Sequence, residues 1–197
     1  ADPEALQHWL APTGSKPVPL VMGIAGAAPL IRILKSAERV PWSGHSSRYA
    51  IEEVYEEITR ARMTLIFVNT RSQAEMTFQW LWEANEANLP IALHHGSLDV
   101  GQRRKVEAAM AAGKLKAVVC TSTLDLGIDW GDVDLVVQVG APKGSSRLLQ
   151  RIGRANHRLD EASTALLVPS NRFEVLECEA ALEAVAENAQ DSEYPMV

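Results

Sequence analysis

Short apolar runs alternate with stretches of helical spacing along most of the chain. Five runs have the length of a buried strand, and the segments between them carry apolar residues at helical intervals. The predicted strands are 64–68, 90–94, 116–120, 134–139 and 164–168, and the predicted helices are 46–62, 72–83, 99–112, 145–152 and 172–186. This alternation is typical of a parallel sheet covered on both faces. We therefore predict an α/β fold, a three-layer sandwich with a mainly parallel sheet of about five to six strands.

The first 47 residues follow a different pattern. They are rich in Pro and Gly and contain two short apolar pieces, 18–22 and 30–34. We interpret residues 1–47 as a linker with one or two strands, 48–186 as the folded domain, and the polar segment 187–197 as a tail. Because the chain does not begin with Met, we expect the natural protein to start upstream.

The composition of the 197 residues is that of a globular protein, with 47% hydrophobic and 22% charged residues. No apolar run approaches the roughly 20 residues that cross a bilayer, so we expect no membrane association. The two cysteines, Cys120 and Cys178, leave a disulfide possible, but reduced thiols in a cytoplasmic protein are the expectation. The net charge is −6, yet the segment from Lys143 to Arg158 holds five basic and no acidic residues. This pattern indicates a local basic site on an acidic protein.

Polar residues follow four of the predicted strands. In open parallel sheets, ligands bind beyond the carboxyl ends of the strands, so these loops are the first candidates for a site. The loops read Asn69-Thr70-Arg71, His94-His95-Gly96-Ser97-Leu98, Thr121 to Asp129, and Gly140 to Ser146.

Four sequence blocks, each at a strand end or on the helix that follows it, resemble helicase motifs. TLIFVNTR (64–71) resembles motif IV, HHGSL (94–98) the element after it, TSTLDLGIDW (121–130) motif V, and QRIGRANHR (150–158) motif VI. Between about residues 41 and 186, the chain resembles the second RecA-like domain of superfamily 2 DEXH-box DNA helicases. The wording of the blocks is closest to the large helicase-related (Lhr) group, ligase-associated bacterial type. The resemblance implies a RecA-like sandwich and a role in an ATP-dependent motor.

The resemblance also implies roles at the ATP site. Arg154 matches the arginine finger that stabilises charge on the transferred γ-phosphoryl group. Gln150 matches a residue that bridges to the acidic motif or the γ-phosphate. Asp129 matches the acceptor for the ATP ribose, or it is a turn-forming Asp before Trp130 and Gly131. Gly127 allows close approach of the backbone or simply turns the chain. The second phosphate-facing residue stays open, because His157 stands at the usual position of an Arg and Arg158 follows it.

The expected nucleic-acid contacts are to phosphates, since a motor that moves along any sequence does not read base edges. The matching positions are Thr70, Arg71, Gly96, Ser97, Thr121, Ser122 and Lys143. Ser97 is equally well explained as a helix N-cap. Ser145 and Ser146, beside Lys143, either add a phosphate contact or cap the next helix. Trp42 and Trp130 lie in loops where a base could stack on them.

Two further patterns have competing explanations. Arg147, Arg151, Arg154 and Arg158 are spaced to share one helix face, which is either a solvated basic face or part of a phosphate site. His94 and His95 suggest a metal, but no Cys or further His stands at ligand spacing, so we predict no metal site on this chain.

The phosphate-cradling Gly-x-x-x-x-Gly-Lys-Ser/Thr loop is absent from the sequence, and 160–163 (DEAS) matches an acidic motif only in its letters. We therefore expect the chain alone to be inactive, with ATP bound against a first RecA-like domain that also holds Mg²⁺. Expected partners are single-stranded DNA or a 3′-tailed duplex, a winged-helix domain of the same polypeptide, and a ligase-associated repair system. The alternatives are a stand-alone nucleic-acid-binding module, an RNA-directed helicase and, least supported, an α/β enzyme with a small-molecule site.

Overall fold

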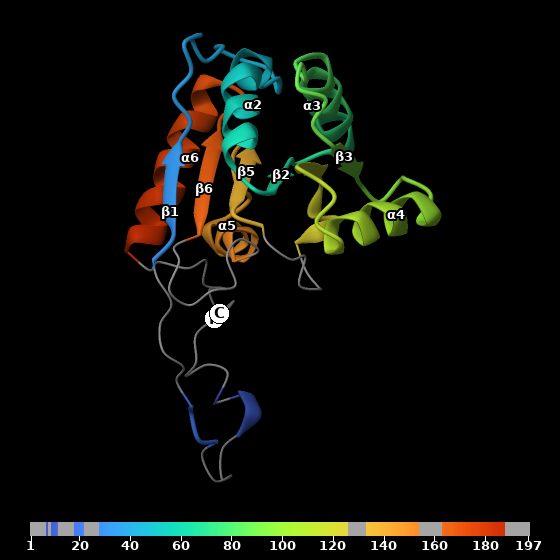
Figure 1. Ribbon diagram of the computed structural model, residues 1–197. Helices are drawn as coiled ribbons and strands as arrows, with labels where there is room; N and C mark the ends of the chain where they lie inside the picture. The colour runs from blue at the N-terminus through green and yellow to red at the C-terminus, as the bar shows by residue number, and fades with distance from the viewer. Residues whose placement is uncertain are drawn as a thin grey trace.

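The computed structural model describes residues 7, 9–11, 18–21, 28–125, 133–153 and 163–187. Within these ranges, the elements with given bounds are six strands and the helices α2 to α6, which alternate, with two short 3-10 turns (η) between them (Figure 1). The strands are β1 Leu30–Ile33, β2 Thr64–Phe67, β3 Ile91–His94, β4 Ala117–Cys120, β5 Leu135–Val139 and β6 Thr164–Val168. The helices are α2 Ile51–Arg60, α3 Arg71–Glu83, α4 Val100–Ala111, α5 Ser145–Ile152 and α6 Arg172–Ala186, and the turns are η1 Arg48–Ala50 and η2 Ser122–Leu124.

The six strands form one sheet in the order β1-β6-β5-β2-β4-β3, and every neighbouring pair is parallel. β2 lies near the middle, with Thr64 level with Ala117 of β4 and Leu135 of β5. Because all strands run the same way, their carboxyl ends meet at a single edge. The predicted α/β sandwich with a parallel sheet is therefore confirmed.

Helices cover both faces of the sheet, so the molecule has three layers (Figure 1). In β2, Ile66 belongs to the core formed with α2 and α3, whereas Leu65 and Phe67 belong to the core formed with α4, α5 and α6. This alternation follows from the strand itself, where successive side chains point to opposite faces. All four β2 residues are buried, which explains why the strand reads as an unbroken apolar run.

The amino-terminal segment contributes one strand to the sheet. β1 is an outermost strand of the sheet and pairs with β6, and its residues alternate between exposed and half-buried. Residues 18–21 form no regular element. The region predicted as one helix, 46–62, contains the turn η1 followed by α2. Of the two predicted apolar pieces, only the one at residues 30–34 forms a strand among the residues described.

Both cysteines are free and buried. Burial raises the pKa of the Cys178 thiol to about 12, and burial also raises that of Cys120. Each therefore acts as a small apolar core residue. Within the described ranges, none of the helices combines the length and the hydrophobicity that crossing a membrane requires.

Candidate functional site

Four loops meet at the edge formed by the carboxyl ends of the strands, and hydrogen bonds join them. Asn69 Nδ2, after β2, donates to the Ala141 carbonyl after β5 at 2.9 Å. The Thr121 amide, after β4, donates to the His94 carbonyl of β3 at 3.3 Å. The fold thus brings the described candidate residues of these four loops to one edge of the sheet.

Thr70 and Arg71 lie at the start of α3. Thr70 is its N-cap, and its hydroxyl accepts from the Gln73 amide at 3.2 Å while the Gln73 side chain accepts from the Thr70 amide. This capping box satisfies two backbone donors of the first turn. Arg71 is exposed and donates to Glu75 at 2.8 Å, and that hydrogen bond lowers the pKa of Glu75. Thr70 therefore has a structural role, and Arg71 is a solvent-accessible cation.

The end of β3 and the loop after it hold two buried histidines and two exposed residues. The His94 ring contacts Thr123 Oγ1 at 2.8 Å and Glu107 Oε1 at 3.1 Å, so both its nitrogens have partners in the protein. His95 is also buried, and its Nε2 lies 3.5 Å from Glu75 Oε1. Both rings are enclosed by neighbouring elements, whereas Gly96 and Ser97 are exposed.

Asp99, and not Ser97, is the N-cap of α4, and its side chain accepts from the Gly101 amide at 2.7 Å. The N-cap explanation of Ser97 is therefore wrong. The expected helix start at residue 99 moves by one position for the same reason, since an Asp side chain binds a free amide of the first turn.

Thr121 and Ser122 link β4 to the turn η2. Thr121 is half-buried, Ser122 is exposed, and the turn ends at the buried Leu124 and Asp125. Small hydroxyls beside backbone amides at the end of a strand suit contact with a phosphate group.

Lys143 is exposed and precedes α5. The N-cap of α5 is Gly144, whose φ of 94° favours glycine, and no side chain caps the helix there. The explanation of Ser145 and Ser146 as helix caps is therefore wrong, since both follow the N-cap Gly144 and lie inside the helix.

The arginines predicted to share one helix face, of which Arg147 and Arg151 are described, do not form one exposed surface. The Arg147 side chain is 46% exposed, whereas that of Arg151 is 3% exposed. Arg151 Nε donates to Asp125 Oδ1 at 2.8 Å, its Nη1 donates to Gln138 Oε1, and its Cζ lies 4.7 Å from the centre of the Phe67 ring. Arg151 is therefore neither part of a solvated basic face nor an exposed part of a phosphate site, and both explanations are wrong at this residue. Its charge is compensated by Asp125, which lies in another segment.

Gln150 is exposed on α5, next to the buried Arg151. The other residues expected at the ATP site lie outside the described residues, namely Gly127, Asp129, Arg154, His157 and Arg158. Their roles stay predictions. Sequence reasoning missed Asp125 and Gln138, although an Asp inside an otherwise apolar and hydroxyl-rich block was the signal that could have found the first.

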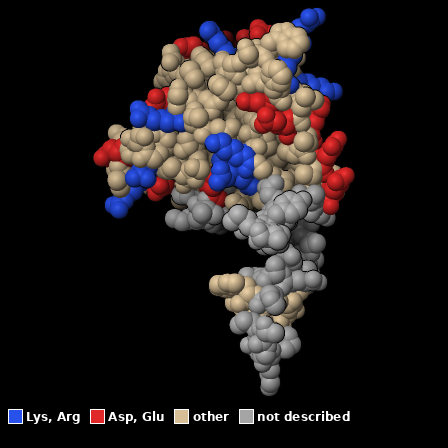
Figure 2. Space-filling view, turned by 180° about the vertical axis from the view of Figure 1, so that it is seen from behind, with Lys and Arg blue, Asp and Glu red and all other residues tan. Residues whose placement is uncertain are grey.

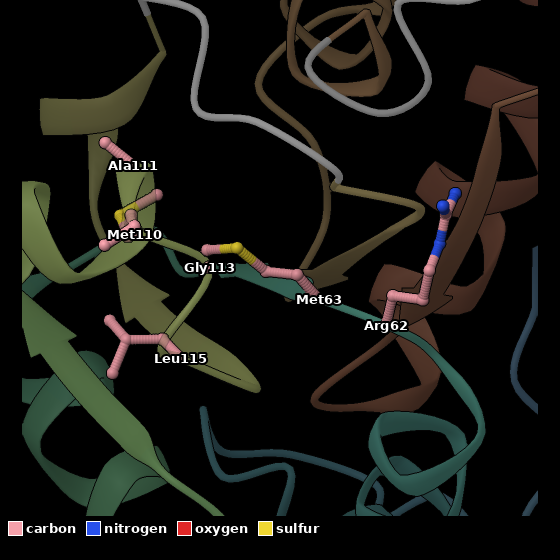
Figure 3. A pocket seen from close by; sticks show the side chains of 7 residues that line it. Arg62, Met63, Met110, Ala111, Gly113 and Leu115 are labelled. Atoms are coloured by element: carbon pink, nitrogen blue, oxygen red, sulfur yellow. The ribbon is translucent and has the colours of Figure 1, made fainter.

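A pocket of about 530 Å³ lies at the opposite edge of the sheet, beside the amino ends of β2 and β4. Met63, Met110 and Leu115 line it, with Arg62 at one side (Figure 3). The described residues that line it include no carboxylate, hydroxyl or imidazole. It therefore lacks the groups expected of a nucleotide or metal site, and we do not count it as part of the candidate site.

Charge is distributed locally on the face shown in Figure 2. Lys and Arg side chains form separate groups between Asp and Glu side chains there. With a net charge of −6, such a surface suits local phosphate contacts better than general attraction of nucleic acid.

The parallel order of the strands and the polar loops at one edge define an α/β domain of the RecA-like class. The sequence matches the family described as the helicase conserved C-terminal domain over residues 48–158. Since that match spans more than half of the chain, the protein belongs to this family.

Relatives of the Lhr type are similar over much of the chain. The ATP-dependent helicase Lhr-Core protein 2 of Thermococcus barophilus is 46% identical over 125 residues, which are 62% of this chain and 14% of that protein. The Lhr helicase/uracil glycosylase of Escherichia coli is 31% identical over 218 aligned positions, covering 87% of this chain and 14% of that protein. The chain thus spans about a seventh of the length of these relatives.

Solved structures give the same result. The Mycobacterium smegmatis helicase Lhr, solved with ssDNA and AMP-PNP, matches with a TM-score of 0.82 and 29% identity, over 98% of this chain and 26% of that one. The C-terminal domain of the DEAD-box protein Dbp5 matches with a TM-score of 0.62 at 19% identity, which supports the fold alone. The predicted RecA-like fold and Lhr relationship are confirmed.

Proposed function

We propose that this chain is the second motor domain of an ATP-dependent DNA helicase or translocase. The observation that carries the proposal is the single edge at which the loops after β2, β3, β4 and β5 meet. The first three loops hold helicase-like blocks, and the fourth block begins on α5, the helix that follows the loop after β5. The similarity to Lhr helicases supports it. Domain limits of 1–47, 48–186 and 187–197 remain part of the proposal.

One part of this edge would hold single-stranded DNA. Arg71, Ser97, Ser122 and Lys143 are exposed there, and Gly96 leaves room because a Cβ at that position would meet only Thr123 Cγ2 at 3.9 Å. Thr70 and Thr121 would add hydroxyls beside backbone amides. These groups bind phosphates without reading bases, which a motor on any sequence requires.

The ATP half of the function rests on α5 and on motif V. Gln150 is exposed, so its amide is available to a nucleotide held by another domain. Arg154 would act as the arginine finger, Asp129 and Gly127 would contact the nucleoside, and Arg158 or His157 would supply the second phosphate contact. Bound ATP, with Mg²⁺ held by a first RecA-like domain, would supply the free energy for the cycle. The residues of this chain would compensate the charge on the γ-phosphate.

The wider setting follows the same resemblance. We propose a bacterial, cytoplasmic protein of DNA repair that acts on single-stranded or 3′-tailed DNA beside a ligase-associated system. A winged-helix domain and a DEXH-type first domain would belong to the same polypeptide. The alternative is a binding module whose strand affinity does not depend on ATP.

Steady-state ATPase activity of the full-length polypeptide, with and without single-stranded DNA, tests the proposal. We expect DNA to stimulate hydrolysis and Arg154→Ala to remove most of it, by about 10³-fold. Arg147→Ala, at an exposed arginine of α5 just before this block, is the matched control and should retain activity. DNA-independent hydrolysis, or full activity of Arg154→Ala, would overturn the arginine-finger assignment.

Replacing the DNA with RNA of the same sequence tests which nucleic acid the motor acts on. We expect DNA to stimulate hydrolysis more strongly than RNA does. Equal or stronger stimulation by RNA would overturn the DNA assignment and leave the motor role standing. Nucleic-acid affinity that is unchanged by ATP, in a polypeptide without hydrolysis, would favour the binding module.

A further inference from the structure

Trp42 is an exposed tryptophan held beside the candidate interface. It is 69% exposed and lies in the loop between β1 and η1. Hydrogen bonds from two helices anchor this loop. The His45 carbonyl accepts from Gln73 Nε2 at 3.3 Å, and the Gly44 carbonyl accepts from Asn171 Nδ2 at 2.9 Å. The loop is therefore fixed to the first turn of α3 and to the N-cap of α6.

The anchoring places Trp42 close to the residues proposed to hold phosphates. Gln73 belongs to the capping box of Thr70, so His45 lies at the amino-terminal turn that carries Thr70 and Arg71. Three residues of chain reach at most about 11 Å, which limits the distance between the Cα atoms of Trp42 and His45. A nucleotide bound at Arg71 would therefore have Trp42 within a few nucleotides.

Arg172 holds the Trp42 ring. Its guanidinium carbon lies 4.1 Å from the centre of the ring, and its Nε donates to the Val40 carbonyl at 3.3 Å. The Arg172 amide in turn donates to the Pro41 carbonyl at 3.0 Å. A cation stacked on one side restricts the ring, while most of the ring surface stays open to solvent.

The charges around this ring favour an anionic ligand. Arg172 stacks on it, Arg39 and Arg48 are exposed on the flanking residues of the same segment, and His45 is 80% exposed. Two acids lie near these cations: Glu38 is exposed beside Arg39, and Glu174, beside His45, has a side chain that is only 14% exposed. Glu174 Oε2 accepts from the amides of Ser170 and Ala141, and its Oε1 lies 3.9 Å from His45 Nδ1. The Glu174 charge is thus neutralised by groups of the protein, and Arg172, Arg39 and Arg48 outnumber Glu38, the exposed one of these two acids.

We propose that Trp42, backed by Arg172, is a stacking platform for one base of a bound single strand. This inference rests on the proposed function and extends its interface beyond the four loops. Single-strand binding combines a positively charged path for the phosphates with aromatic rings that accept any base. Trp42 and Arg172 supply both elements at a position that none of the four helicase-like blocks includes.

The test measures the affinity of this chain for two fluorescent oligonucleotides of about 12 nucleotides, within the site sizes of single-strand binding folds. One is oligothymidylate, and the other has the same backbone without bases. We expect Trp42→Ala to weaken oligothymidylate binding at least about fivefold and to leave abasic binding unchanged, because stacking needs a base. Trp42→Phe should retain most of the affinity.

Trp82→Ala is the matched control, since Trp82 is 61% exposed on α3 but packs beside Phe78. It should change neither affinity. Arg71→Ala should weaken both oligonucleotides equally. If Arg71→Ala does so and Trp42→Ala changes nothing, the phosphate interface stands and the platform is overturned. If Trp42→Ala weakens both oligonucleotides equally, Trp42 supports the loop and does not stack. If the wild-type chain binds neither, the interface and the platform both fail.

Discussion

Arg151 and Asp125 form a buried ion pair that connects the loop after β4 to helix α5, with Nε 2.8 Å from Oδ1. The two residues belong to the blocks that resemble motifs V and VI. Asp125 follows Thr121 and Ser122, on the proposed nucleic-acid side, and Arg151 follows Gln150, on the proposed nucleotide side. The pair therefore fixes the position of one block relative to the other from inside the core.

We expect Arg151→Met to destabilise the chain strongly, because it removes the buried cation 2.8 Å from the Asp125 carboxylate and leaves only the half-exposed Arg147 at 3.7 Å. Breaking a buried pair from one side typically costs about 3–5 kcal/mol. Urea unfolding measures the change in the free energy of unfolding. Arg147→Met is the matched control, since Arg147 lies 3.7 Å from the same carboxylate with a half-exposed side chain and should cost at most about 1 kcal/mol. Equal losses for the two variants would contradict a structural role specific to Arg151.

His95 should make stability depend on pH. Burial lowers its pKa, Arg71 and His94 act in the same direction, and Glu75 at 3.5 Å opposes them. Among the described residues, neither ring nitrogen has a hydrogen-bond partner. Since the folded-state pKa lies below the unfolded value of about 6.5, the unfolded chain binds the proton more readily. The contribution of neutral His95 to the free energy of unfolding is therefore fully present above about pH 6.5. It decreases as the pH falls below about that value towards the lower pKa of the folded state.

Urea unfolding at several pH values between about 5 and 8 measures this dependence. The contribution of one proton is at most about 1.4 kcal/mol per pH unit. His95→Gln should reduce the slope below pH 6.5, whereas His45→Gln, at a histidine with an 80% exposed side chain, should leave it as in the wild type. An unchanged slope in His95→Gln would assign the pH dependence to other groups.

Ser97 and Asp99 lie two residues apart, and we expect the first to affect DNA binding and the second to affect stability. Asp99→Ala should cost about 1 kcal/mol, because the amide of Gly101 loses its acceptor at the N-cap of α4. Ser97→Ala should change stability by less than about 0.5 kcal/mol, because Ser97 is exposed and does not cap the helix. Thermal unfolding and oligothymidylate binding, measured on both variants, test this. A loss of affinity in Ser97→Ala without loss of stability supports a phosphate contact, and unchanged affinity removes Ser97 from the interface.

Gly140 should tolerate alanine less well than Gly113. Both have positive φ, +80° and +62°, where a non-glycine residue costs about 1–2 kcal/mol. A Cβ at Gly113 meets nothing within 4 Å, whereas one at Gly140 would lie 2.9 Å from Asn69 Nδ2, the donor to Ala141. We expect Gly140→Ala to lose more stability than Gly113→Ala and to weaken oligothymidylate binding by shifting the loop after β2. Equal losses would mean that the Asn69 side chain moves without cost.

The sheet was predictable because its strands are buried on both faces. β2, β4 and β5 have no exposed residue, so each appears in the sequence as a continuous apolar run. The start of α4 was harder to predict, since Asp99 suits the first helical turn and the N-cap alike, and only its bond to Gly101 distinguishes them. The loops could be assigned to one edge because parallel strands leave no other arrangement.

The buried partners of Arg151 could not be predicted from spacing. Helical spacing places Arg147 and Arg151 on one face, but it does not say which side of that face meets the core. Asp125 lies 26 residues before Arg151, and Gln138 belongs to a different strand. The Trp42–Arg172 contact is another such case, because it depends on a loop and a helix start from opposite ends of the domain.

The pairing of β1 with β6 has a consequence for the order of folding. Contacts between these ends of the domain span long stretches of chain, as the hydrogen bond between Ser47 and Ser170 does over 123 residues. During synthesis on the ribosome, β1 emerges before the other five described strands, but it gains its neighbour in the sheet only when β6 has been made. Among the described strands, the one made first is therefore paired last, and we expect the loop that carries Trp42 to become ordered at the same step.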